Sequence, residues 1–528
     1  MSARHIAFAI SNSSSSRKLY KDDAKSLIET QLTALNGGLI EVLSRYQPNN
    51  TVRIWHGTIR AIEEFINIPL FGINAPGLVE WLSSIRLDDL FQPDRVSVFH
   101  SVRNALSEHL EEGVVQRYLQ LLMQTVAIAQ AFRINLQPVL GAGITLDTVG
   151  AAVNYFMSRR RHLLSLLYIM PYACRGTDEL APLDTLNVLL PVIELNCVPI
   201  TSYHLKLAHL ETLEDFSLEV DEIGAQASHW SDMLDDSFLE PERASIITMA
   251  ELRRDQFVLP ERELPNPKQV FSAAELRNSA GLIGATYSAF GLNDTDFAAM
   301  TQLVRQLSRL CRDDYYIEIG KQKLRSILGL QSTLDPDELE RLLVNTSSDY
   351  VTSSNAYEPF VNLGDTVVSN VNLLSRFLYA FKNVHLHSRR RFQIHAGFIF
   401  EDMVRRDLSR MGFQVTDVRR VNRKEFDVVA THGGVIYNFQ CKNNWIDLAK
   451  VEAERALYVR YNRALVNYYR RALAKEANRE DLLKAELSLG RVEHYVISRF
   501  PVITTDTRVI NYNQIGKLST IISAANSS

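Results

Sequence analysis

Three polar residues near the C-terminal end of the chain have types and spacings suited to chemistry on a charged substrate. Asp427 lies in the first of two β-rich runs within EFDVVATHGGVIYNFQCKNN (425–444), and Gln440 and Lys442 lie in the second. If the two runs pair across the glycines between them, a carboxylate, an amide oxygen and an ammonium group form one compact cluster. The elements around these residues decide whether the cluster forms.

Alternating side chains along residues 435–442 predict a strand with two different faces. One face carries Ile436, Asn438, Gln440 and Lys442, and the other carries Val435, Tyr437, Phe439 and Cys441. The preceding run is expected to be a strand with Glu425 and Asp427 on one face and Phe426 and Val428 on the other.

The turn between the strands sets their register. With the turn centred on residues 432–433, Asp427 would lie across from Asn438 and diagonal to Gln440; with 433–434 as the turn, it would face Gln440 directly. Either register places Asp427 on the side of Gln440 and Lys442.

An amphipathic helix is expected over 392–413, and it brings a second carboxylate. Glu401 falls in the middle of an apolar stripe that includes Ile394, Phe398, Val404 and Leu408. A carboxylate on the buried side of a helix is costly unless it is paired or bound to a metal. The alternatives are a misjudged face or a structural salt bridge with an arginine.

The order of these elements resembles the PD-(D/E)xK nuclease superfamily, most closely its Mrr-like restriction endonuclease branch, in which Gln replaces the second acid. The matching segments are GFIFEDMV around Glu401, the MGF before a strand, and FDVVA…VIYNFQCKNN; a further strand at 493–502 suits the continuation of the sheet. The resemblance covers residues 382–528 and implies an α/β restriction-endonuclease-like domain with a central mixed β-sheet. Phe426 stands where the family motif has proline.

What the resemblance implies is a metal-dependent DNA endonuclease that uses Mg²⁺ or Mn²⁺. Asp427 would bind the metal, with Gln440 and the Cys441 carbonyl as further ligands and Glu401 completing the site directly or through water. Lys442 would position or deprotonate the attacking water and stabilise the charge that develops at phosphorus. The expected catalytic set is therefore Glu401, Asp427, Gln440 and Lys442.

Charge is divided unevenly along the chain. Residues 382–528 contain 25 Lys and Arg against 15 Asp and Glu, a net charge of +10, whereas the remainder contains 32 against 46, a net charge of −14. The C-terminal part should therefore attract a polyanion, with duplex DNA favoured over single strands, and the acidic part is expected to bind a protein partner or a second copy of the chain. The eleven acidic residues of 211–242, where no basic residue occurs, are interpreted as a solvated face or surface loop.

Two basic segments are candidates for contact with the DNA backbone. A helix expected over 455–475 places its basic residues within one arc, and a short arginine run precedes the Glu401 helix. The expected nucleic-acid-binding residues are Arg389, Arg390, Arg391, Arg460, Arg463, Arg470, Arg471 and Lys475. Tyr458, Tyr461, Tyr468 and Tyr469 either stack on bases or pack in an aromatic core. His385 and His387 fit phosphate contact or plain surface, and His395 could assist the chemistry.

Four regions are expected along the 528 residues: a helical N-terminal domain (1–240), a linker with helices (241–299), either a winged-helix-like domain or a generic α+β connector (300–381), and the nuclease-like domain (382–528). The segment 141–156 is interpreted as a helix start rather than a dinucleotide-binding loop, because its glycine spacing is wrong. In 300–381 we expect two helices, the second capped by Thr333 or Asp335, and a hairpin over 349–370. The second helix is acidic, which favours packing or protein contact over DNA reading.

Composition excludes several classes. The N-terminus has no apolar core of signal-peptide length, so export is not expected. The most hydrophobic run, 180–200, is broken by polar residues and prolines, so a membrane span is not expected. Cys174, Cys197, Cys311 and Cys441 have no metal or disulfide spacing, which fits a reducing cytoplasm.

Restriction or anti-invader defence follows from the family resemblance, with the N-terminal part sensing, recruiting or oligomerising. The alternative is a catalytically inactive nuclease fold that binds nucleic acid or serves as an interaction scaffold. The presence of both Asp427 and Lys442 favours the enzyme.

Overall fold

The computed structural model describes residues 17–71, 73, 75–92, 95–136, 145–220, 225–228, 272–289, 296–330, 335–387, 389–446 and 450–527. The expected linker at 240–268 lies outside these residues, as do the side chains of His385, His387 and Arg391. By its contacts the chain divides into two compact units: unit 1 comprises Met1–Phe8, Thr30–Ser202 and Arg254–Lys382, and unit 2 comprises Ala9–Glu29, Tyr203–Arg253 and Asn383–Ser528.

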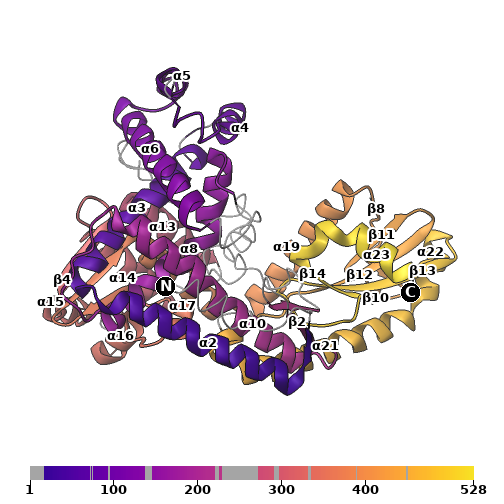
Figure 1. Cartoon of the computed structure of the whole chain (residues 1–528). Helices are drawn as coiled ribbons and strands as arrows, with labels where there is room; N and C mark the ends of the chain where they lie inside the picture. Colours follow the sequence, from indigo (N-terminus) through magenta and orange to yellow (C-terminus); the bar gives the residue numbers. More distant parts are fainter. Residues whose placement is uncertain are drawn as a thin grey trace. The chain divides into compact units, whose positions relative to one another are not determined.

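The described residues between 21 and 308 are mostly helical, as predicted for the N-terminal part of the chain (Figure 1). Its helices are α2 (Lys21–Ser44), α3 (Pro48–Phe71), α4 (Pro76–Ser84), α5 (Arg95–Ser107), α6 (Glu112–Asn135), α8 (Val149–Ala173), η2 (Thr185–Leu189), α9 (Leu190–Val192), η3 (Ile193–Cys197), α10 (Val198–Thr212), α13 (Ala273–Ala289) and α14 (Asp296–Ser308). The prediction of a helix start in 141–156 is confirmed, because α8 begins at Val149 and the Thr148 side chain accepts a hydrogen bond from the Ala151 amide. Trp55 on α3 donates its indole N–H to the Leu163 carbonyl of α8, which ties the buried centre of unit 1 together.

A small sheet in unit 2 was not predicted. Strands β1 (Arg17–Tyr20), β2 (Ser217–Val220) and β3 (Ala225–Ala227) pair antiparallel in that order. The first of these is a short, mostly exposed strand whose pairing partner lies far along the chain, so local sequence carries little signal for it.

The segment expected to resemble a winged helix contains the anticipated helices and a hairpin. Its elements are β4 (Tyr316–Gly320), α15 (Lys321–Leu328), α16 (Pro336–Leu343), β5 (Val344–Asn345), α17 (Tyr350–Asn355), β6 (Phe360–Leu363), β7 (Thr366–Asn370) and α18 (Val371–His387), with strand order β4-β7-β6-β5. Asp335 caps α16 through the Asp337 amide, as expected. The hairpin prediction was too long: Asp349 accepts a hydrogen bond from the Thr352 amide and starts α17 where we expected a strand.

The C-terminal part is an α/β domain with a mixed sheet. Its elements are α19 (Arg390–Arg410), β8 (Gln414–Val415), β9 (Arg420–Val421), β10 (Lys424–Glu425), β11 (Val428–His432), β12 (Val435–Lys442), α20 (Lys450–Ala453), α21 (Arg455–Ala477), α22 (Glu480–Leu487), β13 (Arg491–Ser498), β14 (Val509–Asn511), η6 (Tyr512–Lys517) and α23 (Leu518–Ser527). The strands lie in the order β14-β13-β12-β11-β8; β12 runs parallel to β13 and antiparallel to β11. The expected continuation of the sheet is therefore β13, reached from β12 through α21 and α22.

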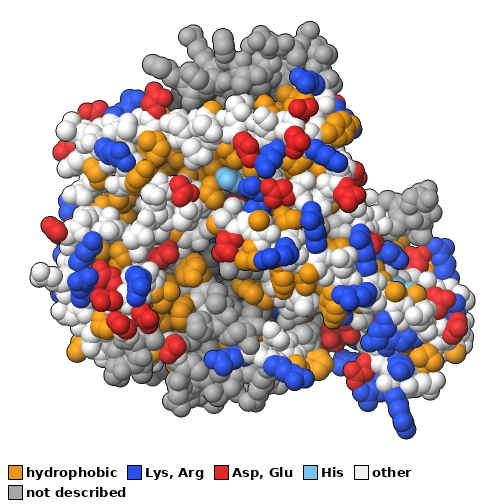
Figure 2. Space-filling view, turned by 90° about the horizontal axis from the view of Figure 1, so that it is seen from below, with side chains coloured by type: hydrophobic (Ala, Val, Ile, Leu, Met, Phe, Trp, Pro, Cys, Tyr) orange, Lys and Arg blue, Asp and Glu red, His pale blue; other side chains and the backbone are white. Residues whose placement is uncertain are grey.

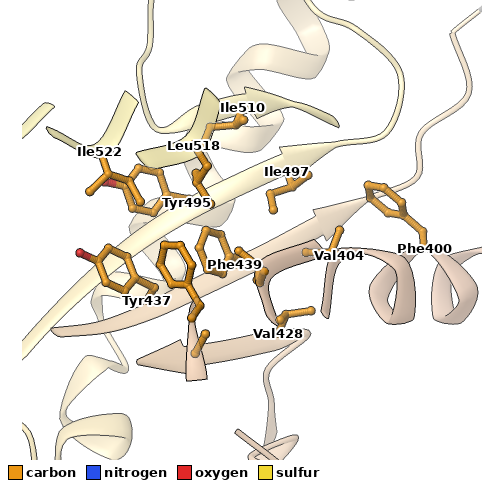
Figure 3. Close-up of a cluster of buried hydrophobic side chains, with 13 residues drawn as sticks. Phe400, Val404, Val428, Tyr437, Phe439, Tyr495, Ile497, Ile510, Leu518 and Ile522 are labelled. Atoms are coloured by element: carbon orange, nitrogen blue, oxygen red, sulfur yellow. The ribbon is translucent and has the colours of Figure 1, made fainter. Parts of the chain in front are cut away.

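The two faces of this sheet differ as the alternation predicted. Tyr437 and Phe439 of β12 pack with side chains of α19 and α23 in one cluster (Figure 3). On the opposite face Val429 and Ile436 pack with Leu483 of α22. Helices thus cover both faces of the β11–β12 hairpin.

Two expectations about faces were wrong. Ile394 and Phe398 are exposed, because the buried stripe of α19 runs through Phe400, Val404 and Leu408 instead. The first strand of the hairpin begins only at Val428; Phe426 precedes it and packs on the opposite face from Val428, with Val429. Glu425 belongs to the separate β10, which pairs with β9.

Among the residues described, one helical run, Thr185–Thr212, is long and apolar enough to cross a membrane. More than half of its most apolar window, 56%, is buried inside the fold, as in a core helix of a soluble protein. Cys174, Cys197, Cys311 and Cys441 are all free.

Candidate active site

The turn of the β11–β12 hairpin fixes the register of the predicted cluster. Gly433 and Gly434 have φ values of +57° and +77°, the pair of positive angles that a tight type I′ turn requires. Val428 pairs with Phe439, so Asp427 lies opposite Gln440. The second of the two registers considered from the sequence is the one adopted.

Asp427, Gln440 and Lys442 lie together at the end of this hairpin. The Lys442 ammonium donates to Gln440 Oε1 at 3.0 Å and lies 4.0 Å from Asp427 Oδ2. The Cys441 amide donates to the same Asp427 oxygen at 2.9 Å. Gln440 is only 8% exposed, so its amide is held in this arrangement rather than sampling solvent.

Glu401 of α19 is the second carboxylate of the cluster, and the charge of Asp427 affects its pKa. Burial, reinforced by the negative charge of Asp427, raises the pKa of Glu401 to about 7. Burial also raises the pKa of Asp427, although Lys442 and the Cys441 amide oppose the rise. When two neighbouring carboxyl groups have raised pKa values, a cation bound between them would favour the ionised form of both.

An arginine on α19 holds Asp427 from one face of the sheet. Arg405, one turn beyond Glu401, donates to the Asp427 carbonyl at 2.5 Å and to the Thr416 carbonyl at 3.2 Å. The contact ties the segment that carries one carboxylate to the helix that carries the other.

A second arginine holds the same segment from the opposite face. Arg479, between α21 and α22, donates to the Glu425 carbonyl at 3.3 Å, and its guanidinium lies 5.5 Å from the centre of the Phe426 ring. It also pairs with the buried Glu476, whose other oxygen accepts from Asn438 of β12 at 3.0 Å. Sequence reasoning missed Arg405 and Arg479, since nothing in their spacing marks them among the many arginines of this domain.

The chain just beyond Lys442 is anchored by a neighbouring strand. The Arg499 amide donates to the Lys442 carbonyl at 2.9 Å, and its guanidinium donates to Asn443 Oδ1 at 2.9 Å. Burial lowers the pKa of Arg499 to about 9. The Trp445 ring packs edge-on against the Phe500 ring, with the ring centres 4.9 Å apart. The Trp445 carbonyl accepts a hydrogen bond from the Tyr461 hydroxyl.

The predicted nucleic-acid-binding residues are exposed wherever their side chains are described. Arg389 and Arg390 lie at the start of α19, and the basic residues of α21 are Arg460, Arg463, Arg470, Arg471 and Lys475. Lys and Arg side chains gather on the side of unit 2 seen in Figure 2. Two of these residues, Arg463 and Arg470, also contact acidic residues of the same chain.

Intramolecular contacts engage part of the α21 surface. Arg463 donates to the Glu211 carbonyl at the end of α10, and Arg470 pairs with Asp506 at 3.3 Å. Arg455 adds an ion pair with the Glu211 carboxylate at 2.8 Å. The acidic run beginning at Glu211 is therefore not wholly a solvated surface.

The four tyrosines of α21 divide between the two roles considered. Tyr458 and Tyr469 are 3% and 0% exposed and belong to the core, whereas Tyr461 and Tyr468 are 42% and 46% exposed. Only the second pair could stack on a base.

The donor set suits a hard divalent cation. Carboxylate oxygens of Glu401 and Asp427, the Gln440 amide oxygen and a main-chain carbonyl are the ligands that Mg²⁺ and Mn²⁺ prefer. In the described part of the chain no group of three or more His, Cys, Asp and Glu side chains could hold a metal ion. A metal here would thus depend on neutral oxygens and water besides the two carboxylates.

Comparisons with protein-family models, curated proteins and solved structures found no match for this chain. The class of the site is therefore argued from its own geometry.

Proposed function

We propose that residues 382–528 form a metal-dependent DNA endonuclease of the PD-(D/E)xK type. The observation that carries the proposal is the meeting of Asp427, Gln440 and Lys442 at the end of one hairpin, with the Lys442 ammonium within 4.0 Å of both partners' oxygens. The neighbouring Glu401 supplies the second carboxylate that the family pattern requires. The order α19, β8, β11, β12, α21 and β13 is also the order expected from the resemblance.

The residues divide the work of phosphodiester hydrolysis between them. A divalent cation, when bound, supplies positive charge for the phosphate and lowers the pKa of water. Asp427 and Glu401 would hold that cation, with Gln440 and the Cys441 carbonyl as neutral ligands. Lys442 orients the attacking water and stabilises the charge that develops on the phosphate oxygens. Arg405 keeps Asp427 in place through its carbonyl, and Arg479 holds the segment before it through the Glu425 carbonyl.

The substrate proposed is duplex DNA, bound through its phosphates. Residues 382–528 carry the net charge of +10, and exposed arginines lie at the start of α19 and along α21. Within the same proposal the chain is a cytoplasmic restriction or anti-invader enzyme. The acidic, mostly helical remainder senses, recruits or oligomerises, and its winged-helix-like segment contacts protein rather than DNA.

Cleavage of plasmid DNA by the full chain in Mg²⁺ tests the proposal. We expect Lys442→Ala and Asp427→Ala to abolish cleavage, while thermal unfolding shows that both variants remain folded. Lys25→Ala is a matched control, because Lys25 lies on α2 with a side chain 46% exposed and forms only a loose ion pair with Glu29. Cleavage at the native rate by Lys442→Ala would refute the assignment.

A further inference from the structure

Helix α19 exposes two large apolar side chains on the way to the catalytic carboxylate. Ile394 and Phe398 are 52% and 56% exposed, whereas Phe400, Val404 and Leu408 of the same helix are buried. Because the two are four residues apart, their side chains are neighbours on one face. Glu401 follows Phe398 by three residues, so the apolar pair continues along the helix directly to the proposed site.

Basic residues precede this pair along the chain, and acidic residues follow it. The arginine run 389–391 lies before Ile394, whereas Glu401 and Asp402 follow Phe398 by three and four residues. Arg389 and Arg390 are exposed at the start of α19, one turn before Ile394. The helix surface therefore presents cations first, then an apolar pair, then the carboxylate of the proposed cleavage site.

Nucleic acid fits this sequence of features better than a protein does. Phosphates pair with arginines, and exposed base faces stack on or receive apolar side chains. A protein partner would need an acidic rim around an apolar spot, and it would block the access to Glu401 that hydrolysis requires.

We propose that Ile394 and Phe398 form a wedge that enters the base stack beside the scissile phosphate. The inference rests on the proposed nuclease function and specifies its substrate: DNA in which a base step is unpaired or easily unstacked. A fully paired duplex must be unstacked before the wedge can enter, which costs free energy; a bulged or mismatched duplex has already lost that stacking.

Binding and cleavage by the full chain test the wedge. The substrates are a fully paired duplex and the same duplex with a two-base bulge, each carrying 2-aminopurine at the distorted step. The native protein should bind and cut the bulged duplex about tenfold better, and its binding should raise the fluorescence as the base unstacks. Phe398→Ala should lose the preference and the rise, with a drop in affinity of about tenfold or more, as for loss of one stacking contact.

Exposed positions allow clean controls, because surface substitutions of this kind rarely unfold a protein. Phe398→Tyr keeps a flat ring and should retain the preference, and Ile134→Ala removes an apolar side chain that is 71% exposed on α6 and should change nothing. Unchanged preference in Phe398→Ala would overturn the wedge. So would a change in oligomeric state without a change in DNA binding, since the pair would then be a contact between copies of the chain.

The two proposals fail separately. Fluorescence is measured in the Asp427→Ala background, so it does not depend on cleavage. A rise that requires Phe398 in a protein that never cuts DNA would keep the wedge and refute the nuclease. Cleavage that requires Lys442 with no fluorescence rise would do the reverse.

Discussion

Replacing Gln440 by Glu tests whether this side chain belongs to a metal site. Gln440 is almost fully buried and lies opposite Asp427 on the paired strand. The substitution changes one atom and keeps the shape of the side chain, so packing against neighbours is preserved. What changes is one unit of negative charge.

The size of the effect follows from the distances around the residue. Cross-strand neighbours lie about 5 Å apart, at which two carboxylates repel by about 3 kcal/mol with an effective dielectric constant near 20. Lys442 Nζ is 3.0 Å from the oxygen that would become charged, and its attraction offsets that repulsion in the metal-free protein. We therefore expect the metal-free fold to tolerate Gln440→Glu. A divalent cation gains an anionic ligand, and its affinity should rise about 10- to 100-fold, or about 1.4 to 2.8 kcal/mol.

Calorimetric titration with Mn²⁺ measures this gain. Gln414→Glu is the matched control, because Gln414 is exposed on the edge strand β8 and the charge change is the same. Equal metal affinity in the native protein and in both variants would show that residue 440 lies outside any metal site. Tighter binding in both variants would mean that the gain reflects net charge alone.

Three further predictions concern positioning, pH and salt. Arg405→Ala should slow single-turnover cleavage by about 100-fold and lower the free energy of unfolding by about 2 kcal/mol, because the Asp427 carbonyl loses its charged donor; native rates would show that this contact positions nothing. Burial lowers the pKa of Lys382 to about 7, so the unfolded chain binds the extra proton between about pH 7 and its usual value of 10.5, and stability should rise with pH across that window. Urea unfolding of Lys382→Met should lack that rise, and a slope equal to that of the native protein would contradict it. The Arg460→Ala, Arg471→Ala double variant should reduce the slope of log affinity against log salt by about 2 in fluorescence anisotropy, and an unchanged slope would remove α21 from the DNA surface.

Local sequence was sufficient where a single period or turn decides the structure. Alternation predicted the faces of β12, and the glycine pair limited the hairpin to two registers. Asp335 was one of two residues considered as the cap of α16, because a capping side chain acts within one turn. Each of these features depends only on residues that are close together in the sequence.

Contacts between distant segments were not predictable in the same way. A helical-wheel projection of α19 placed Ile394 and Phe398 on the buried side, because it assumed a straight apolar stripe. In the structure the sheet packs against a face of α19 that is rotated towards Phe400. Arg405 donates to the Asp427 carbonyl and Arg479 to the Glu425 carbonyl. Every residue has a main-chain carbonyl, so the sequence does not show which one an arginine will bond. The pairing of β1 with β2 likewise depends on tertiary structure.

The discontinuous make-up of unit 2 has a consequence for how the protein is made. Its small sheet joins residues near the start of the chain to others near position 220, and Glu211 meets Arg455 and Arg463 only after the last third has been synthesised. Closing such long loops is entropically slow, and domains completed late fold late during synthesis. We expect unit 2 to mature after the ribosome has released the chain, so a truncated product would lack the finished cluster around Asp427.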